Sequence, residues 1–204
     1  MSQTVWMAMV ASRQEPWIAT DHTPVAPGGS PVDNGGDMGA PVYLGLGSNL
    51  GDREAAIEGA LLRLAAGGFR VTRRSSLWLT EPVGGPPQGW FLNAVAQGET
   101  ALRPEALLEA CLAAEREMGR VRAERNGPRT IDVDILFYGD ERRSSPGLTI
   151  PHPRLHERRF VLEPLAEIAP GFVHPALGLT VGELLARCKD ASSVRPQAPA
   201  GART

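Results

Sequence analysis

The stretch that decides the fold is Gly119–Tyr138, which reads Gly-Arg-Val-Arg-Ala-Glu-Arg-Asn-Gly-Pro-Arg-Thr-Ile-Asp-Val-Asp-Ile-Leu-Phe-Tyr. It opens with four arginines within ten residues, Arg120, Arg122, Arg125 and Arg129. Its second half is rich in β-branched and aromatic residues, which predicts a strand. Cationic side chains therefore lead directly into a strand that carries two acids.

The strand that begins at Thr130 alternates apolar and acidic side chains. Its two faces are expected to carry Ile131, Val133, Ile135 and Phe137 on one side and Asp132 and Asp134 on the other. Positions two apart on a strand lie about 7 Å apart, so both carboxylates can reach one hard cation or a close pair of cations. A solvated outer face is the alternative, but aspartate is depleted in strands. Two acids beside arginines instead favour Mg²⁺ bound to a polyphosphate.

Composition limits the class of protein. The 204 residues are 42% hydrophobic and 22% charged with a formal net charge of −2, which fits one globular domain with appendages. The near-neutral charge argues against nucleic-acid binding through a bulk basic surface. Cys111 and Cys188 form no metal-binding or disulfide pattern, so we expect free thiols in a cytoplasmic protein. No apolar run approaches the roughly 18 residues of a membrane span, and a secretory signal is not expected.

Both ends of the chain are expected to lie outside the folded domain. Residues 1–40 are rich in proline and glycine and poor in aliphatic side chains, which predicts a disordered extension. Residues 190–204 are expected to form a frayed, disordered tail. The folded domain is therefore expected to span residues 41–189.

Periodicity and capping signals divide that domain into elements. The expected strands are 42–47, 69–79, 90–96, 130–138 and 148–150, and the expected helices are 52–67, 104–118, 158–168 and 180–188. Asp52 and Thr180 are expected to cap helices. Gly45, Gly47 and Gly51 match neither a dinucleotide-binding nor a P-loop spacing, so they are expected to permit a tight strand-to-helix turn.

Two further segments carry chemistry with alternatives left open. A long glycine and proline loop, 80–89, precedes Phe91 and Asn93, which could hold a flat heterocycle or could equally be core and a turn cap. His152 and His156 have zinc-like spacing, but Pro153 disfavours a helix through His152 and no third ligand is near, so a zinc site is not expected. His152 is either a polar group near phosphate or a surface histidine.

Together these motifs resemble the 6-hydroxymethyl-7,8-dihydropterin pyrophosphokinases of folate biosynthesis. The segments that carry the resemblance are Gly47–Asp52, Phe91–Asn93, Gly127–Ile135, Pro151–His152 and Arg158–Leu165. The resemblance implies an α+β fold with a ferredoxin-like core, elaborated to a three-layer αβα sandwich with a mostly antiparallel sheet. It also implies transfer of the β,γ-diphosphate of ATP to the hydroxymethyl group of the pterin, giving AMP and the pterin diphosphate.

The same resemblance implies roles for individual residues. The catalytic positions are Arg120, Arg129, Asp132 and Asp134, with Asp132 and Asp134 also holding two Mg²⁺ ions. The positions for ATP, the co-substrate, are Glu115, Arg122, Arg125, Ile135, Thr149, His152 and Arg158. The pterin-binding positions are Thr80, Val83, Phe91, Asn93 and Phe160. The expected partners are these two small molecules alone, without nucleic acid or membrane, and the protein is expected to be a monomer.

The sequence departs from the family pattern at two positions, and two other functions compete with the one that the resemblance implies. Asn126 stands where some relatives carry Trp in a loop that is one residue longer, and Pro153 stands where others carry Tyr. One competing interpretation is a ferredoxin-like module that only binds nucleotide or a partner protein. Another is an RNA-binding domain that uses the arginines, although the paired acids and the lack of an aromatic RNA-binding strand argue against it.

Overall fold

The computed structural model describes residues 40–120 and 127–198. The disordered extension predicted for residues 1–40 therefore lies outside the described residues, apart from Ala40. The elements are β1 (Val42–Ser48), α1 (Arg53–Ala66), β2 (Phe69–Arg74), β3 (Trp78–Thr80), β4 (Phe91–Thr100), α2 (Pro104–Glu117), β5 (Asp132–Tyr138), β6 (Arg143–Ser145), β7 (Leu148–Ile150), a 3-10 turn (Leu155–Glu157), α3 (Arg159–Ile168), α4 (Val181–Arg187) and β8 (Val194–Pro196).

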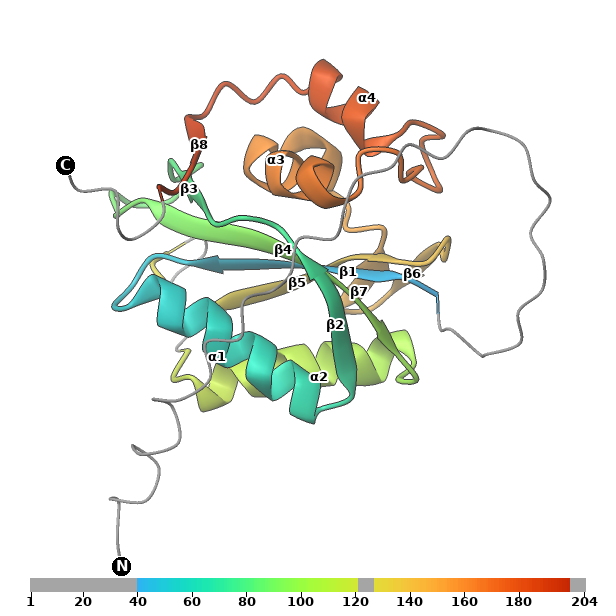
Figure 1. Cartoon of the computed structure of the whole chain (residues 1–204), viewed down its shortest axis with the longest axis horizontal. Coiled ribbons are helices and arrows are strands. Elements are labelled where there is room, and N and C mark those ends of the chain that lie inside the picture. The colour runs from blue at the N-terminus through green and yellow to red at the C-terminus, as the bar shows by residue number, and fades with distance from the viewer. Residues whose placement is uncertain (1–39, 121–126, 199–204) are drawn as a thin grey trace, which may run out of the picture. The chain divides into compact units, whose positions relative to one another are not determined.

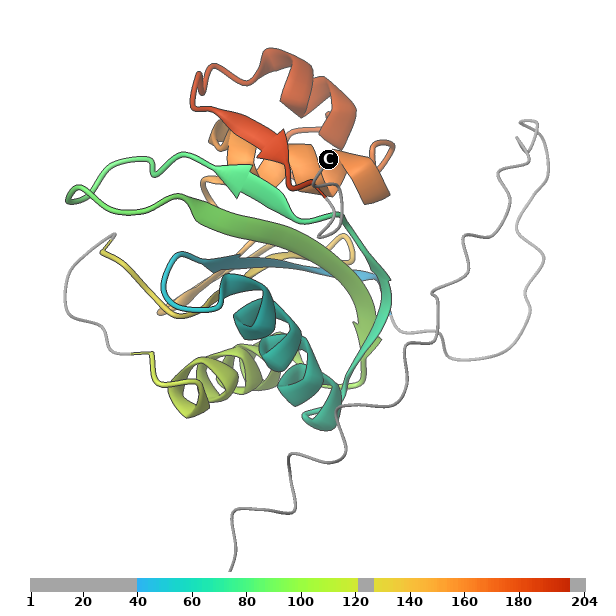
Figure 2. The ribbon, with the colours of Figure 1, turned by 60° about the vertical axis from the view of Figure 1, so that its left-hand side comes forward.

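The strands form an antiparallel sheet covered on both faces by helices. Its order is β5-β1-β4-β3-β8, with β2 also paired to β4, while β6 and β7 form a separate hairpin. Helices α1 and α2 cover one face, and α3 covers the other, with α4 packed against the outer side of α3 (Figures 1 and 2). This arrangement confirms the predicted α+β fold with three layers. No helix among the described residues is long and apolar enough to cross a membrane.

Each face of the sheet has its own apolar core. On the α1 and α2 side, Leu44, Leu46 and Ile57 are almost fully buried. On the α3 and α4 side, Tyr43 and Phe137 pack edge to face, with ring centroids 6.0 Å apart. The alternation of side chains along β1 thus supplies both cores.

The structure corrects the predicted position of Phe137. It was expected beside Ile135 but belongs to the other core, on the α3 side. The cause is a bulge in β5, because Tyr43 pairs with Phe137 while Leu44 pairs with Ile135, which leaves Leu136 as an extra residue. A bulge moves the residues beyond it to the opposite face.

The strand expected over 69–79 is divided into β2 and β3. At the division, Ser75 N donates to Val95 O (2.9 Å), and the Ser75 hydroxyl accepts from Val95 N (2.9 Å). A side-chain oxygen thus replaces a strand carbonyl, and the chain bends there.

The prediction of a frayed tail after Lys189 is also wrong for residues 190–198, the part of the tail that the structure describes. Val194–Pro196 form β8, which pairs antiparallel with β3 at the edge of the sheet. The two predicted caps, in contrast, are confirmed. Asp52 Oδ1 accepts from Ala55 N (3.0 Å), and Thr180 forms a capping box with Glu183.

Candidate active site

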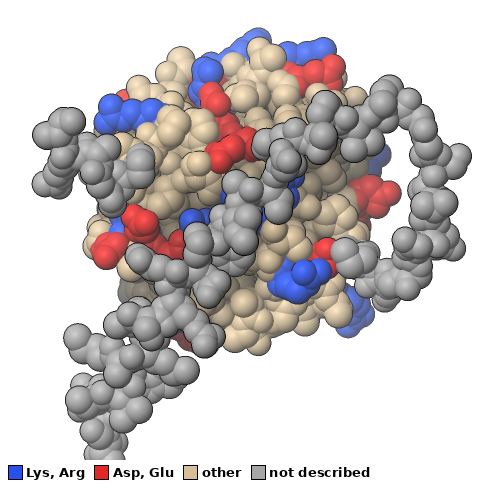
Figure 3. Space-filling model, viewed as in Figure 1, with Lys and Arg blue, Asp and Glu red and all other residues tan. Residues whose placement is uncertain are grey.

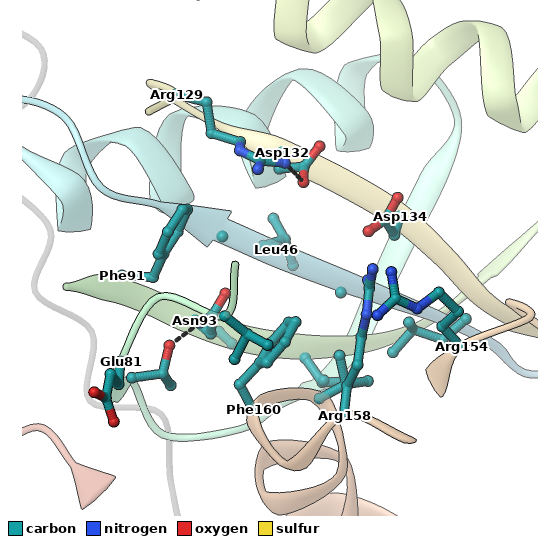
Figure 4. Close-up of a pocket in the computed structure, with 18 of the residues that line it drawn as sticks. Leu46, Glu81, Phe91, Asn93, Arg129, Asp132, Asp134, Arg154, Arg158 and Phe160 are labelled. Atoms are coloured by element: carbon teal, nitrogen blue, oxygen red, sulfur yellow. Dashed lines mark hydrogen bonds and ion pairs between the residues drawn. The ribbon is translucent and has the colours of Figure 1, made fainter. Parts of the chain in front are cut away.

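A cavity of about 270 Å³ opens on the face of the sheet that α3 covers. Strands β1, β4 and β5, the loop after β3 and the start of α3 all contribute to it (Figure 4). The predicted site residues that line it are Thr80, Val83, Phe91, Asn93, Arg129, Asp132, Asp134, Arg158 and Phe160. Residues far apart in the sequence therefore meet at one site.

The floor of this cavity is the backbone of β1. Gly45 and Gly47 line it, and a Cβ at Gly47 would lie 2.5 Å from Asn93 Oδ1. The prediction that these two glycines permit a turn is wrong, because both lie within the strand. Only Gly51 lies in the turn, with φ of 62°. The glycines instead leave room above the sheet.

Asp132 and Asp134 both face the cavity, as their spacing predicts (Figure 4). Val133, between them, packs into the core on the opposite face. Two carboxylates are thereby placed side by side at the cavity wall. Like charges this close need cations to offset their repulsion.

Asp132 is neutralised by two arginines. Arg120 Nη1 lies 2.7 Å from Asp132 Oδ1, and Arg129 Nη1 lies 2.5 Å from Asp132 Oδ2. Asn49 also fixes the Arg129 backbone, because Asn49 Oδ1 accepts from Arg129 N (2.8 Å). Both predicted catalytic arginines thus reach the acid pair.

Glu115, on α2, holds Arg120 and the β5 backbone between the two aspartates. Its side chain is buried, and Glu115 Oε1 accepts from Val133 N (2.8 Å) while also forming an ion pair with Arg120. Burial raises the pKa of Glu115, an effect that these partners oppose. Glu115 therefore links α2 to both β5 and Arg120, and it does not line the cavity.

Asp134 is compensated less directly, because Arg158 and Arg120 act on its charge without a direct ion pair. No hydrogen bond or ion pair reaches its carboxylate from the described residues, although the guanidiniums of Arg154 and Arg158 lie on its side of the cavity (Figure 4). Burial and the negative charge of Asp132 raise its pKa to about 7. A carboxylate that faces a cavity without a direct partner is suited to bind a cation.

The donor set fits a hard divalent cation such as Mg²⁺. Mg²⁺ binds through one or two carboxylates and keeps its remaining ligands from water and substrate phosphates. No group of three or more His, Cys, Asp or Glu side chains placed to hold a metal occurs among the described residues. Asp132 and Asp134 alone therefore suit a cation that arrives with a phosphate substrate, and they do not form a closed structural site.

Aromatic side chains line the opposite part of the cavity. Phe91 and Phe160 lie across from each other above the sheet, with Asn93 between them (Figure 4). Asn93 Nδ2 donates to Thr80 Oγ1 (2.6 Å), which fixes the orientation of the amide. Val83 lies on the rim and is 47% exposed. All five positions expected to bind the pterin thus line this one cavity.

Each phenylalanine is also covered by an arginine. Arg129 Cζ lies 5.5 Å from the centroid of Phe91, and Arg158 Cζ lies 5.5 Å from that of Phe160. These contacts are cation–π interactions. They join the charged part of the cavity to the aromatic part.

Two positions expected to bind ATP lie in a second cavity. Thr149 and His152 line a space of about 390 Å³, together with Arg142, His156 and His174. Burial and the nearby Arg158 lower the pKa of His152 to about 4, so its imidazole is neutral. His152 Nδ1 accepts from Arg154 N (3.3 Å), which leaves Nε2 as the hydrogen-bond donor.

Of the other predicted ATP positions, Arg158 lines the first cavity, whereas Ile135 lines neither. The Ile135 side chain is buried in the α1 and α2 core. Arg122, Arg125 and Asn126 lie outside the described residues. The expected role of their loop therefore stays a prediction.

The sequence did not single out several residues of the site. Glu81, Gln88 and Arg154 line the first cavity. Asn49 Nδ2 donates to Gln88 Oε1 (2.9 Å), so Asn49 connects the loop after β3 to Arg129. Asn49 lies in the segment Gly47–Asp52 that carries the family resemblance, but no role was assigned to it, because an amide in the turn after β1 is an ordinary turn residue.

Fold and site together define a class, a ferredoxin-like α+β kinase that acts on small molecules. Comparison with known proteins then gives the family. The chain belongs to the 7,8-dihydro-6-hydroxymethylpterin-pyrophosphokinase family, whose model matches residues 43–170. As a member, it is a pyrophosphokinase of folate biosynthesis that uses ATP as co-substrate.

Two relatives with the same name support this assignment. A 2-amino-4-hydroxy-6-hydroxymethyldihydropteridine pyrophosphokinase from Methylorubrum extorquens is 51% identical over 146 residues, which cover 71% of this chain and 91% of the relative. One from Synechocystis is 43% identical over 157 residues, covering 76% and 80% respectively.

A solved structure agrees with the fold. A crystal structure described as HPPK-DHPS in complex with substrates matches with a TM-score of 0.58 at 14% identity. The match covers 73% of this chain but 43% of that one, so this chain spans less than half of the solved protein.

Proposed function

We propose that the first cavity transfers the β,γ-diphosphate of ATP to the hydroxymethyl group of 6-hydroxymethyl-7,8-dihydropterin, giving AMP and the pterin diphosphate. The observation that carries this assignment is the position of Asp134. Its carboxylate forms no hydrogen bond or ion pair with the described residues, and it lies beside Asp132, between arginines and two facing aromatic rings. The acids and arginines suit a polyphosphate, and the rings suit a flat heterocycle. One cavity thus offers places for both substrates.

On the phosphate side, we infer that Asp132 and Asp134 hold Mg²⁺. Mg²⁺ bound there would neutralise charge on the phosphates during transfer. Once a cation neutralises Asp132, Arg120 and Arg129 are free to bind the diphosphoryl group, since Asp132 is their partner without substrate. Glu115 keeps Arg120 near the site throughout.

On the pterin side, Phe91 and Phe160 hold the ring between them, and Asn93 reads its edge. The carbonyl oxygen of Asn93 accepts from the pterin, while one N–H of its NH₂ group donates to Thr80 and fixes the orientation of the amide. Closure of the loop around Val83–Gly89 excludes water, which would otherwise compete with the hydroxymethyl group for the phosphorus.

The nucleoside of ATP extends towards the second cavity. Thr149 and His152 line that cavity, and the neutral His152 can donate through Nε2 without needing a proton from solvent. Arg158 stands between the two cavities, since it lines the first and lowers the pKa of His152 in the second.

We also propose that the enzyme acts as a monomer in the cytoplasm without a nucleic-acid or membrane partner. Its cysteines are free, as is usual in a reducing compartment. Basic and acidic side chains are interspersed among the described residues visible in Figure 3, which is unlike a surface that tracks nucleic acid.

The direct test is AMP formation from ATP when the pterin is added. The wild type should require both the pterin and Mg²⁺, and Asp132→Ala should lower turnover by about 10²-fold or more while remaining folded. Asp140→Ala is the matched control, because Asp140 is an exposed acid just beyond β5. AMP formation excludes a module that only binds nucleotide. Unchanged turnover in folded Asp132→Ala would remove the acid pair from the mechanism.

A further inference from the structure

The segment 190–197, here called the C-terminal strap, crosses the edge of the sheet beside β3 and α3 (Figures 1 and 2). It contains β8 and follows the last helix. The strap lines neither cavity. It nevertheless contacts three separate parts of the structure that carry the pterin-side residues.

The first contact is with the start of α3. Arg158, the residue at the N-cap position, makes no capping hydrogen bond with its own side chain. Asp190 supplies this cap instead, because its Oδ2 accepts from Arg159 N (2.9 Å) while its Oδ1 accepts from Ser192 N (2.9 Å). A carboxylate at a helix N-terminus satisfies a free N–H group and interacts favourably with the helix dipole. Asp190 therefore fixes the turn that carries Phe160.

The second contact is with the end of β3. Val194 pairs with Thr80, whose hydroxyl holds the amide of Asn93. One residue further on, Glu81 N donates to Ser193 O (2.9 Å), and Ser193 N donates to Glu81 Oε2 (3.1 Å). The strap thus holds Thr80 and the first residue of the loop that borders the cavity.

The third contact is with the far end of the same loop. Arg195 Cζ lies 5.2 Å from the centroid of the Trp90 ring. Trp90 is also held from α1, because Arg53 Nη1 donates to its carbonyl oxygen (2.8 Å). Since Trp90 directly precedes Phe91, the strap and α1 together fix the position of one ring of the aromatic pair.

We propose that the C-terminal strap is a positioning element for the pterin, and that Asp190 and Arg195 are its positioning residues. Its contacts lead to Phe160, Asn93 and Phe91, which are the three side chains assigned to the heterocycle. Asp132 and Arg129, in contrast, are held by Arg120 and Asn49. The inference rests on the proposed function, because it uses the assignment of the pterin to these side chains.

The decisive variant is Arg195→Ala in the full-length protein, since Arg195 is exposed and its loss is compatible with folding. We expect the KM for the pterin to rise about two- to fivefold, the scale of one exposed cation–π contact. The kcat and the KM for ATP should stay within twofold of the wild type. Arg195→Lys should recover part of the pterin KM, because an ammonium group also binds an aromatic face.

Asp190→Ala tests the other end of the strap. We expect the KM for the pterin to rise about tenfold, with a smaller rise for ATP through Arg158. Thr180→Ala is the matched control, because it removes the N-cap of α4, away from the residues that line the first cavity. Lys189→Ala is the charge control for Arg195→Ala, since Lys189 is an exposed cation just before the strap. Both controls should leave the pterin KM unchanged.

Hydrogen exchange gives a readout that does not depend on turnover. In the absence of substrates, amides of residues 81–90 should exchange faster in Arg195→Ala than in the wild type. Unchanged pterin KM in both strap variants, or an equal rise in Thr180→Ala, would overturn the inference. If the wild type is active and the strap variants keep its KM for the pterin, only the proposed role of the strap is refuted. If the wild type forms no AMP with the pterin, the proposed function is refuted.

Discussion

Two aspartates on one face of β5 have opposite surroundings. Asp132 is paired with Arg120 and Arg129, whereas Asp134 forms no ion pair within residues 40–120 and 127–198. Burial and the charge of Asp132 raise its pKa to about 7, although Arg158 and Arg120 oppose this shift. Because this folded-state pKa lies above the unfolded value, the folded protein holds a proton at Asp134 that the unfolded chain releases. The resulting stability is lost as the pH rises from about 4 through about 7.

Asp134→Asn should therefore be more stable than the wild type at pH 8 without Mg²⁺. The amide has the same shape but carries no buried charge. The gain should be smaller at pH 5, and Mg²⁺ should raise the Tm of the wild type but not that of the variant. Thermal unfolding at both pH values measures this. A variant that is no more stable at pH 8, or that responds to Mg²⁺ like the wild type, would contradict the account.

His152 gives the reverse dependence on pH. Its pKa is lowered to about 4 by burial and Arg158, below the usual value, so the unfolded state binds the proton first as the pH falls. The wild type should lose stability from about pH 6.5 towards pH 4. His152→Gln should lose less between pH 8 and pH 5, measured by urea unfolding. Equal losses in the two proteins would mean that His152 is not buried in the neutral form.

At the scale of elements, hydrogen bonds across the sheet decide where strands stop. The division between β2 and β3 depends on Ser75, which is 2% exposed and accepts from Val95 N through its hydroxyl. Without that hydroxyl, a buried N–H group in β4 loses its partner.

Ser75→Ala should cost about 1–3 kcal/mol of unfolding free energy, the cost of an unsatisfied buried group. Denaturant unfolding measures it. Ser144→Ala is the control, because Ser144 is exposed on β6, and it should stay within about 0.5 kcal/mol. Equal stability of the two variants would show that water or a shift of the backbone replaces the hydroxyl.

These elements also show how far the sequence could lead. Asp52 and Thr180 capped their helices as expected, because capping depends on residues three apart. The bulge at Leu136, the bend at Ser75 and β8 were missed, because each depends on a partner strand distant in sequence. The acids and aromatic residues of the site were predicted from motifs, whereas Asn49 was missed because its role depends on Gln88 and Arg129.

At the scale of the whole domain, the two cores serve different purposes. The core under α1 and α2 packs on the other face of the sheet and reaches the first cavity through its strand residues Leu46 and Ala94. From the α3 and α4 core, a helix residue, Val161, lines that cavity as well as Leu136. Movement of α3 therefore changes the site directly. Helix α1 reaches the site through Arg53 in its first turn, whereas its later residues, such as Leu64, affect mainly stability.

Leu162→Ala and Leu64→Ala should both lose about 2–5 kcal/mol, because each leucine is almost fully buried. Only Leu162→Ala should also raise the KM for the pterin, since Leu162 anchors α3 and with it Phe160. Unfolding and steady-state kinetics on both variants measure the difference. An equal rise in KM would show that lost stability alone loosens the site.

The glycine floor of the cavity has a consequence for inhibitors. A compound that lies flat on β1 would contact main-chain atoms, which no substitution can remove. A side chain at Gly47 would collide with Asn93 Oδ1 at 2.5 Å, and one at Gly45 would press on Leu136 at 3.3 Å. Drug resistance should therefore arise on the rim, at positions such as the exposed Val83, and compounds that avoid the rim should select for it less often.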